Sequence, residues 1–255
     1  MTLADLDQPT CLLNDGRTIP LIGYGTYLTT DPDECVAGVL SALEAGYRHI
    51  DTAEGYGNKS LIGRALAGSS VVREDYFLTT KVSPRSFEDA RSHVLASRDR
   101  LGVDYLDLVL LHWPFANYYK AWRDLEAFQR EGVVRSIGVS NFEPSQLIDL
   151  IEFNEVVPAV NQVEMNVICQ RVAERGWMER YDVVPGAWAP LGQWYRREVI
   201  GNSTVADVAR AHDATPAQVA LSYLLEQGVV VLPKSVTPSR IEENLAAASP
   251  PPRCA

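Results

Sequence analysis

Short apolar runs alternate with segments of helical periodicity between residues 21 and 245. Most runs are rich in β-branched residues, which is typical of strands buried on both faces of a parallel sheet. The pattern predicts eight strands, each followed by a helix. The predicted strands cover residues 21–25, 47–52, 76–82, 105–113, 134–140, 158–165, 183–190 and 229–236.

Helix starts are marked by a capping residue followed by proline. Asp31 precedes Pro32, which predicts an N-cap and a first helical turn. The apolar residues that follow recur at helical spacing: Val36, Val39, Leu40 and Leu43. Gly46 then predicts the end of this helix. The pairs Thr215-Pro216 and Thr237-Pro238 predict two later helices in the same way.

Eight strand–helix units favour an α/β fold of the (β/α)8 TIM-barrel type. An open, doubly wound sheet is the alternative, but it would usually carry a glycine fingerprint after its first strand. The segment GYGTYL at 23–28 does not match G-x-G-x-x-G. Residues 10–20 predict an N-terminal β-hairpin with a tight turn at Asp15-Gly16, placed to cover the barrel floor. We expect one domain over residues 1–255, with a short irregular tail at 246–255.

The chain has 255 residues and a net charge of −10, which argues against nucleic acid or an anionic membrane as the main partner. The four cysteines form no CxxC pair and no metal motif. No apolar stretch is long enough to span a bilayer, and the N-terminal residues do not resemble a secretory signal. We therefore expect a cytoplasmic protein without a metal, and a monomer.

Four polar residues lie at or just after the ends of three successive predicted strands, where barrel enzymes place their chemistry. Asp51 ends the second strand and Tyr56 lies in the loop after it. Lys81 and His112 end the third and fourth strands. Each alone has an ordinary interpretation, such as a helix cap, a core side chain or a solvated surface residue. Their occurrence together favours one site on the barrel rim.

The chemistry of these four residues is coherent. A free tyrosine has a pKa of about 10, and a nearby ammonium lowers that pKa. Lys81 is expected to supply this charge to Tyr56, and Asp51 to hold Lys81 in place. His112 is expected to donate a hydrogen bond to a carbonyl oxygen. The set predicts a site that donates a proton and stabilises an oxyanion.

At these residues the sequence resembles the aldo-keto reductase family. The motifs that carry the resemblance span nearly the whole chain: GYRHIDTAEGYGN (46–58), TTKV (79–82), LHWP (111–114), SIGVSNF (136–142), NQVEMN (161–166), AWAPLG (187–192) and PKSVTPSRIEENL (233–245). Within the family it is similar to bacterial members of the 2,5-diketogluconate reductase type.

The resemblance implies NADPH-dependent reduction of an aldehyde or ketone to an alcohol. Tyr56 would be the general acid, and Asp51 and Lys81 would tune it. His112 would orient the carbonyl, and histidine at this position favours C=O over C=C reduction.

The resemblance also implies positions for the cofactor and the small carbonyl substrate. Residues expected to bind NADPH or NADP+ are Ser140, Asn141, Gln162, Trp188, Leu191, Lys234, Ser235, Arg240 and Asn244. Cations beside a helix N-terminus suit the 2′-phosphate. Residues expected to line the substrate pocket are Tyr24, Tyr27, Trp113 and Phe115.

Two departures from the family pattern stand out. Lys59 occupies a position where members usually have Glu, which changes the local charge. The sequence also ends soon after IEENL, where members usually continue into a loop that walls the substrate pocket. We therefore expect an open pocket and broad carbonyl acceptance.

Two other functions remain open at this stage. One is a non-catalytic NADPH-binding regulatory protein of the same fold. The other is a barrel enzyme of another class, such as an aldolase that forms a Schiff base at Lys81.

Overall fold

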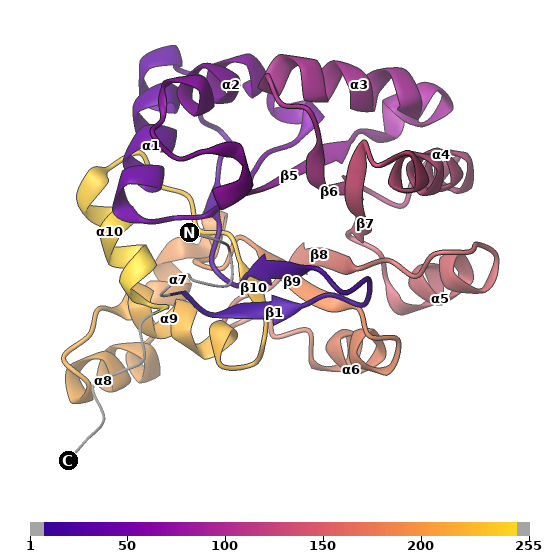
Figure 1. Cartoon of the computed structure of the whole chain (residues 1–255). Coiled ribbons are helices and arrows are strands. Elements are labelled where there is room, and N and C mark those ends of the chain that lie inside the picture. The colour runs from indigo at the N-terminus through magenta and orange to yellow at the C-terminus, as the bar shows by residue number, and fades with distance from the viewer. Residues whose placement is uncertain (1–7, 249–255) are drawn as a thin grey trace.

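A computed structural model of the chain describes residues 8–248 and shows a ring of helices around a central sheet (Figure 1). The sheet has eight parallel strands in the order β10-β9-β8-β7-β6-β5-β4-β3. Their bounds are β3 (Tyr24–Gly25), β4 (His49–Asp51), β5 (Phe77–Val82), β6 (Leu106–Leu111), β7 (Val134–Ser140), β8 (Val160–Glu164), β9 (Val184–Trp188) and β10 (Val230–Val231).

The sheet closes on itself between its first and last strands. The Val231 amide donates to the Leu21 carbonyl at 2.7 Å, and the Gly23 amide donates to the Val231 carbonyl at 2.9 Å. Ile22 and Val231 form a parallel bridge. These bonds satisfy backbone groups that an open sheet would leave at its edges. The TIM-barrel prediction is confirmed, and the alternative of an open doubly wound sheet is wrong.

Each barrel strand is followed by at least one helix. The helices are α1 (Pro32–Ala45), α2 (Lys59–Gly68), α3 (Ala90–Leu101), α4 (Tyr118–Glu131), α5 (Pro144–Glu152), α6 (Val172–Arg180), α7 (Arg196–Ile200), α8 (Ser203–Ala211), α9 (Pro216–Leu225) and α10 (Pro238–Ala246). The side chain of Asp31 caps α1, and Gly46 ends it with a φ of 114°. Thr215 and Gln218 form a capping box at α9. These local signals explain why α1 and α9 begin where the sequence predicts.

The predicted N-terminal hairpin pairs β1 (Thr10–Leu12) with β2 (Thr18–Pro20) in antiparallel fashion. Gly16 in its turn has a φ of 83°, a conformation that glycine adopts without strain. Ser136 near the start of β7 donates to Asp15 at 2.6 Å, and Asn14 donates to the Pro158 carbonyl just before β8 at 3.0 Å. The hairpin therefore lies at the amino-terminal ends of the strands and covers the barrel floor.

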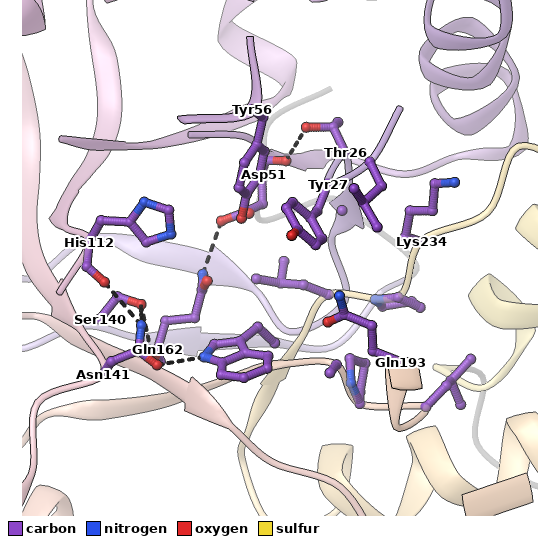
Figure 2. Close-up of a pocket in the computed structure, with 18 of the residues that line it drawn as sticks. Thr26, Tyr27, Asp51, Tyr56, His112, Ser140, Asn141, Gln162, Gln193 and Lys234 are labelled. Atoms are coloured by element: carbon purple, nitrogen blue, oxygen red, sulfur yellow. Dashed lines mark hydrogen bonds between the residues drawn. The ribbon is translucent and has the colours of Figure 1, made fainter. Parts of the chain in front are cut away.

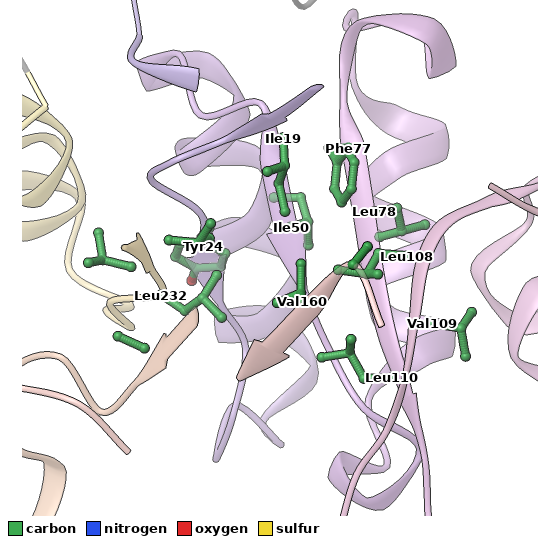
Figure 3. Close-up of a cluster of buried hydrophobic side chains, with 14 of the residues drawn as sticks. Ile19, Tyr24, Ile50, Phe77, Leu78, Leu108, Val109, Leu110, Val160 and Leu232 are labelled. Carbon is green, nitrogen blue, oxygen red and sulfur yellow. The ribbon is translucent and has the colours of Figure 1, made fainter. Parts of the chain in front are cut away.

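Buried side chains of the hairpin and the strands fill the core, as Figure 3 shows for Ile19 of β2 and Ile50 of β4. Deeper polar groups pair with one another: the Nε2 atom of His49 lies 2.9 Å from the Thr79 hydroxyl. Successive side chains of a strand alternate between its faces. Asp51 and Lys81 therefore follow His49 and Thr79 on the same inner face, two residues nearer the carboxyl ends.

Some predicted strands are longer than the observed ones. Residues 229–236 contain only the two-residue strand β10, because Pro233 has no amide hydrogen to continue the ladder. The predicted irregular tail begins where α10 ends, at Ala246, but most of it falls on residues 249–255, outside the described residues. No helix within residues 8–248 is both long and apolar enough to cross a membrane.

Candidate active site

A cavity of about 410 Å³ opens at the carboxyl ends of the barrel strands (Figure 2). Its walls come from the ends of every barrel strand except β5 and from the loops that follow them. This is the end of the barrel where the fold places binding and catalysis. Asp51, Tyr56 and His112 line the cavity, and Lys81 lies behind them, 1% exposed.

The four residues predicted as a catalytic set come together around the ammonium of Lys81. The Nζ atom of Lys81 lies 2.5 Å from Asp51 Oδ1 and 3.2 Å from the Thr52 carbonyl. It also donates to the hydroxyl of Tyr56 at 3.4 Å, a long hydrogen bond. The Tyr56 ring lies 5.9 Å from the His112 ring, centroid to centroid. Tyr56 and Asp51 are thus the members of the lysine network that face the cavity.

Lys81 is held in its charged form. Burial alone would lower its pKa, but the Asp51 carboxylate and the Tyr56 hydroxyl outweigh burial and raise it. An ammonium has no lone pair with which to attack a carbonyl carbon. The arrangement therefore argues against a Schiff base at Lys81 and favours an electrostatic role.

The acidity of Tyr56 differs from the sequence-based expectation. Burial raises the pKa of Tyr56, and Asp51 adds to the increase, while the Lys81 ammonium lowers it only in part. The expected net lowering is wrong, because desolvation of a phenolate outweighs one ammonium that is already paired with a carboxylate. Tyr56 is therefore protonated at neutral pH and holds a proton to give.

His112 is uncharged in this environment. Burial, together with the positive charges of Lys81 and Lys59, lowers its pKa to about 3. The backbone amide of His112 donates to the Val82 carbonyl at 3.0 Å, which holds the residue directly after β6. A neutral imidazole keeps one N–H donor, which is what the predicted contact with a carbonyl oxygen requires.

Gln162 connects β8 to the lysine network. Its side-chain amide donates to Asp51 Oδ2 at 3.0 Å (Figure 2), so Asp51 accepts from both Gln162 and Lys81. The carbonyl oxygen of the Gln162 side chain is left to accept a hydrogen bond from a ligand. A residue predicted to bind the cofactor therefore also holds the catalytic carboxylate.

Asn141 joins three strand ends through its side chain. Its Nδ2 donates to the His112 carbonyl and to the Ser140 hydroxyl, both at 3.0 Å, and its Oδ1 accepts from the Trp188 indole at 2.8 Å. Its φ of 63° is one that asparagine tolerates better than most residues. This network orients the Trp188 ring along the cavity wall.

The residues present fit a nicotinamide cofactor in part of the cavity. Trp188 offers a flat aromatic face, and Gln162 offers an acceptor for a carboxamide N–H. Both N–H groups of Asn141 are already used, so a carboxamide would have to share Asn141 with His112 and Ser140. In addition, the side-chain nitrogen of Gln193 is buried without a hydrogen-bond partner in the described chain and lines the same cavity. A ligand oxygen would satisfy it.

The residues expected to bind a 2′-phosphate begin at the edge of this cavity and continue into the loop and helix after β10. Lys234 lines the cavity and is exposed, whereas Arg240 is exposed on the first turn of α10. The Ser235 hydroxyl accepts from the Thr237 amide at 3.1 Å, which shapes the loop before α10. Asn244 is buried on α10. Leu191 lines the cavity. The two cations therefore lie in one loop–helix unit, as predicted.

The residues expected to line the substrate pocket divide into two groups. Tyr27 and Trp113 line the cavity and are 39% and 38% exposed. Phe115 is exposed outside it and stacks on Trp113 with ring centroids 5.7 Å apart. Tyr24 does not line the cavity, and its hydroxyl donates to the Ser235 carbonyl at 2.6 Å. Its place in β3 points it outward, under α1, and the expectation for Tyr24 is wrong.

Sequence reasoning missed part of the cavity wall. Gln193, Trp194 and Arg196 follow β9 and line it, and Leu28 lines it from the loop after β3. Gln193 lies directly after the AWAPLG motif, and that position was the available signal. Leu28 lies in a loop and Trp194 in a short 3-10 turn, and no periodicity marks these exposed apolar residues.

Comparison with known proteins gives a consistent result. Residues 21–251 match the model of the aldo/keto reductase family. An aldo-keto reductase of Mycolicibacterium smegmatis is 42% identical over 245 residues, which cover 93% of this chain and 86% of that protein. The methylglyoxal reductase DkgA of Escherichia coli K12 is 38% identical over 241 residues, covering 93% of this chain and 87% of that protein.

The fold has a solved counterpart of the same kind. The crystal structure of a Bombyx mori aldo-keto reductase in complex with NADP superposes with a TM-score of 0.88 at 31% identity. The match covers 94% of this chain and 87% of that one. Sequence and structure comparisons therefore point to the same group of proteins.

Proposed function

Because the chain belongs to the aldo/keto reductase family of oxidoreductases, we propose that it reduces an aldehyde or ketone to an alcohol with NADPH. The observation that carries the proposal is the geometry at Tyr56. Its hydroxyl lies 3.4 Å from the ammonium of a fully buried lysine that is paired with Asp51. A protonated phenol beside a fixed positive charge is suited to donating a proton as negative charge develops on a neighbouring oxygen.

Residues of this chain would supply the proton and polarise the carbonyl oxygen. The carbonyl oxygen would lie between the Tyr56 hydroxyl and the neutral His112 ring, each donating a hydrogen bond to it. When bound, NADPH supplies the hydride that reduces the carbonyl carbon. Tyr56 gives its proton to the oxygen, which completes the alcohol O–H, and the phenolate left behind is stabilised by the Lys81 ammonium. Water then returns a proton to Tyr56.

We assign the cofactor to the wall opposite Tyr56. Trp188 would pack against the nicotinamide ring, with Ser140, Asn141 and Gln162 at its carboxamide and Leu191 and Gln193 along the connecting groups. Lys234, Ser235 and Arg240 would hold the 2′-phosphate, and Asn244 would lie near the adenine. The NADP complex of the Bombyx mori relative supports the choice of NADP(H) over a different cofactor.

The substrate side of the cavity is aromatic. Tyr27 and Trp113 line it beside Tyr56, and the Tyr27 and Tyr56 rings lie 5.0 Å apart. A relative is named methylglyoxal reductase, so a small ketoaldehyde belongs among the first compounds tested. Single-domain organisation, a monomeric state and cytoplasmic location remain predictions.

The test follows NADPH absorbance with a panel of aldehydes, diketones, keto-sugars and keto-acids. We expect turnover with several of them and formation of one alcohol per NADPH consumed. If the protein binds NADPH tightly but turns over no member of the panel, the reductase proposal fails. The alternative of a non-catalytic regulatory protein of the same fold would then be favoured.

Replacing Arg240 with alanine should weaken NADPH far more than NADH. A hydrogen bond to a charged group contributes about 1.5–3 kcal/mol, or roughly 10- to 150-fold in Kd. Both constants would be measured by quenching of tryptophan fluorescence. The matched control is Arg130→Ala, which removes an exposed arginine on α4 and should change neither constant. Equal weakening of both cofactors by Arg240→Ala would show that Arg240 does not contact the 2′-phosphate.

A further inference from the structure

A second lysine is buried near the active site. Lys59 is the first residue of α2, three positions after Tyr56, and is only 4% exposed. Its Nζ atom is buried and has no hydrogen-bond partner in the described chain. A buried ammonium without a partner is costly, so a lysine in this setting calls for an explanation.

The carboxylate of Glu54 favours the charged form of Lys59, but other donors already occupy its oxygens. Glu54 accepts from the Ser83 amide at 2.9 Å, from the Ser86 hydroxyl at 2.7 Å and from His93 Nδ1 at 2.6 Å. Burial would raise the pKa of Glu54, but these hydrogen bonds outweigh it and lower the pKa. Glu54 is therefore a stable anion that acts on Lys59 through space and makes no hydrogen bond to it.

The other elements around Lys59 add positive charge or none. Lys81 on β5 and Arg100 on α3 both disfavour its charged form. The buried face of α1, which packs on α2, carries only Cys35, Gly38 and apolar residues. Lys59 also sits at the amino-terminal end of α2, where the helix dipole opposes a cation. Burial is the largest effect, and together these groups lower the pKa of Lys59 to about 7.

Lys59 also acts on the catalytic groups. Its charge contributes to lowering the pKa of His112, and it opposes the charge of Lys81. Because Lys59 does not line the cavity, it would not contact a bound substrate. Whatever effect it has on the reaction must pass through Lys81, Tyr56 and His112.

We propose that Lys59 is a positioning residue of the active site. It is a buried, unpaired amine, and its gain or loss of a proton adds or removes a positive charge near Tyr56 and His112, the two residues that donate to the carbonyl oxygen. The proposal rests on the proposed reductase function. Negative charge develops at the carbonyl oxygen and on Tyr56 during reduction. A second nearby cation stabilises that charge, so the form with protonated Lys59 is the faster one.

This assignment gives a specific pH dependence. The kcat/KM for reduction should fall as pH rises through about 7, by roughly 5- to 20-fold, the size of effect expected for one partly screened unit charge near the reacting groups. Lys59→Met keeps the length of the side chain but cannot gain a proton. In this variant the step near neutral pH should be absent, and the rate should stay near the slow value of the wild type.

Folding stability gives a second readout that does not need catalysis. The folded-state pKa of Lys59 is lowered from 10.5 to about 7, so the unfolded chain binds more protons between these values. The wild type should therefore gain stability as pH rises through this window. Below pH 7 the unfolding constant of Lys59→Met should be smaller than that of the wild type by about two to three orders of magnitude.

The experiment measures kcat/KM, NADPH affinity and urea unfolding from about pH 5.5 to 9 in the wild type, in Lys59→Met and in Lys120→Met. Lys120 is a half-exposed lysine paired with Asp124 on α4, so its variant should follow the wild type in all three. NADPH affinity should be unchanged by Lys59→Met.

Each outcome decides the proposal. Loss of the kinetic step and a change in the pH dependence of unfolding in Lys59→Met alone would support it. The same pH–rate profile in the wild type and Lys59→Met would overturn it, and a change in unfolding alone would give Lys59 only a structural role. If the wild type reduces no carbonyl at any pH, the proposed function fails, and with it any role of Lys59 in the reaction.

Discussion

Replacing Tyr56 with phenylalanine should lower kcat/KM for carbonyl reduction by about 10²- to 10⁴-fold, the usual contribution of a general acid. The ring and its packing against Tyr27 and His112 remain, and only the hydroxyl next to Lys81 is lost. NADPH binding should change by less than about twofold, because Tyr56 is not assigned to the cofactor. The measurements are initial rates and the NADPH Kd.

Tyr27→Phe is the matched control for Tyr56→Phe. Tyr27 lines the same cavity with its ring next to Tyr56, but its hydroxyl makes no hydrogen bond in the described chain. This variant should retain most of the activity. Turnover close to that of the wild type in Tyr56→Phe would remove Tyr56 from the role of acid.

Replacing Lys81 with methionine should lower kcat/KM nearly as far, by about 10²- to 10⁴-fold. Burial already raises the pKa of Tyr56, and Lys81 is the group that opposes this increase. Without the ammonium, Tyr56 becomes a weaker acid and its phenolate loses its stabilising charge. Combining Lys81→Met with Tyr56→Phe should add little further loss, because residues that act as one unit are not additive.

The stability of the Lys81 variant needs its own control. Removing Lys81 leaves Asp51 buried without its ion-pair partner, which costs about 3–5 kcal/mol of folding free energy. Adding Asp51→Asn removes the unpaired charge and should recover much of that stability without restoring activity. If the losses from Tyr56→Phe and Lys81→Met multiplied fully in the double variant, the two residues would not form one unit.

The barrel itself could be predicted because local and global signals agree. Buried strands appear as continuous apolar runs, and caps such as Asp31 and Thr215 mark helix starts independently of tertiary structure. The position of Asp51, Lys81 and His112 at strand ends also follows from topology, because parallel strands bring their carboxyl ends to one side.

Other features of the site depend on three-dimensional packing. The direction of the Tyr56 pKa shift is a balance between burial and two neighbouring charges, and a sequence does not give burial. Tyr24 faces away from the cavity because of its register in β3, which the strand pattern leaves open by one residue. The buried amine of Lys59 and the unpaired amide of Gln193 likewise become visible only when their surroundings are known.

The most direct test of carbonyl reduction with Tyr56 as the acid follows the hydrogen atoms of one turnover. The protein would be given NADPH carrying deuterium at both C4 positions and a carbonyl substrate from the panel, and the alcohol would be analysed by mass spectrometry and NMR. The expected alcohol carries one deuterium on the carbinol carbon and a hydroxyl proton that exchanges with water, and this product should be nearly absent in Tyr56→Phe. An alcohol without deuterium on that carbon, or equal yields from the two proteins, would contradict this mechanism.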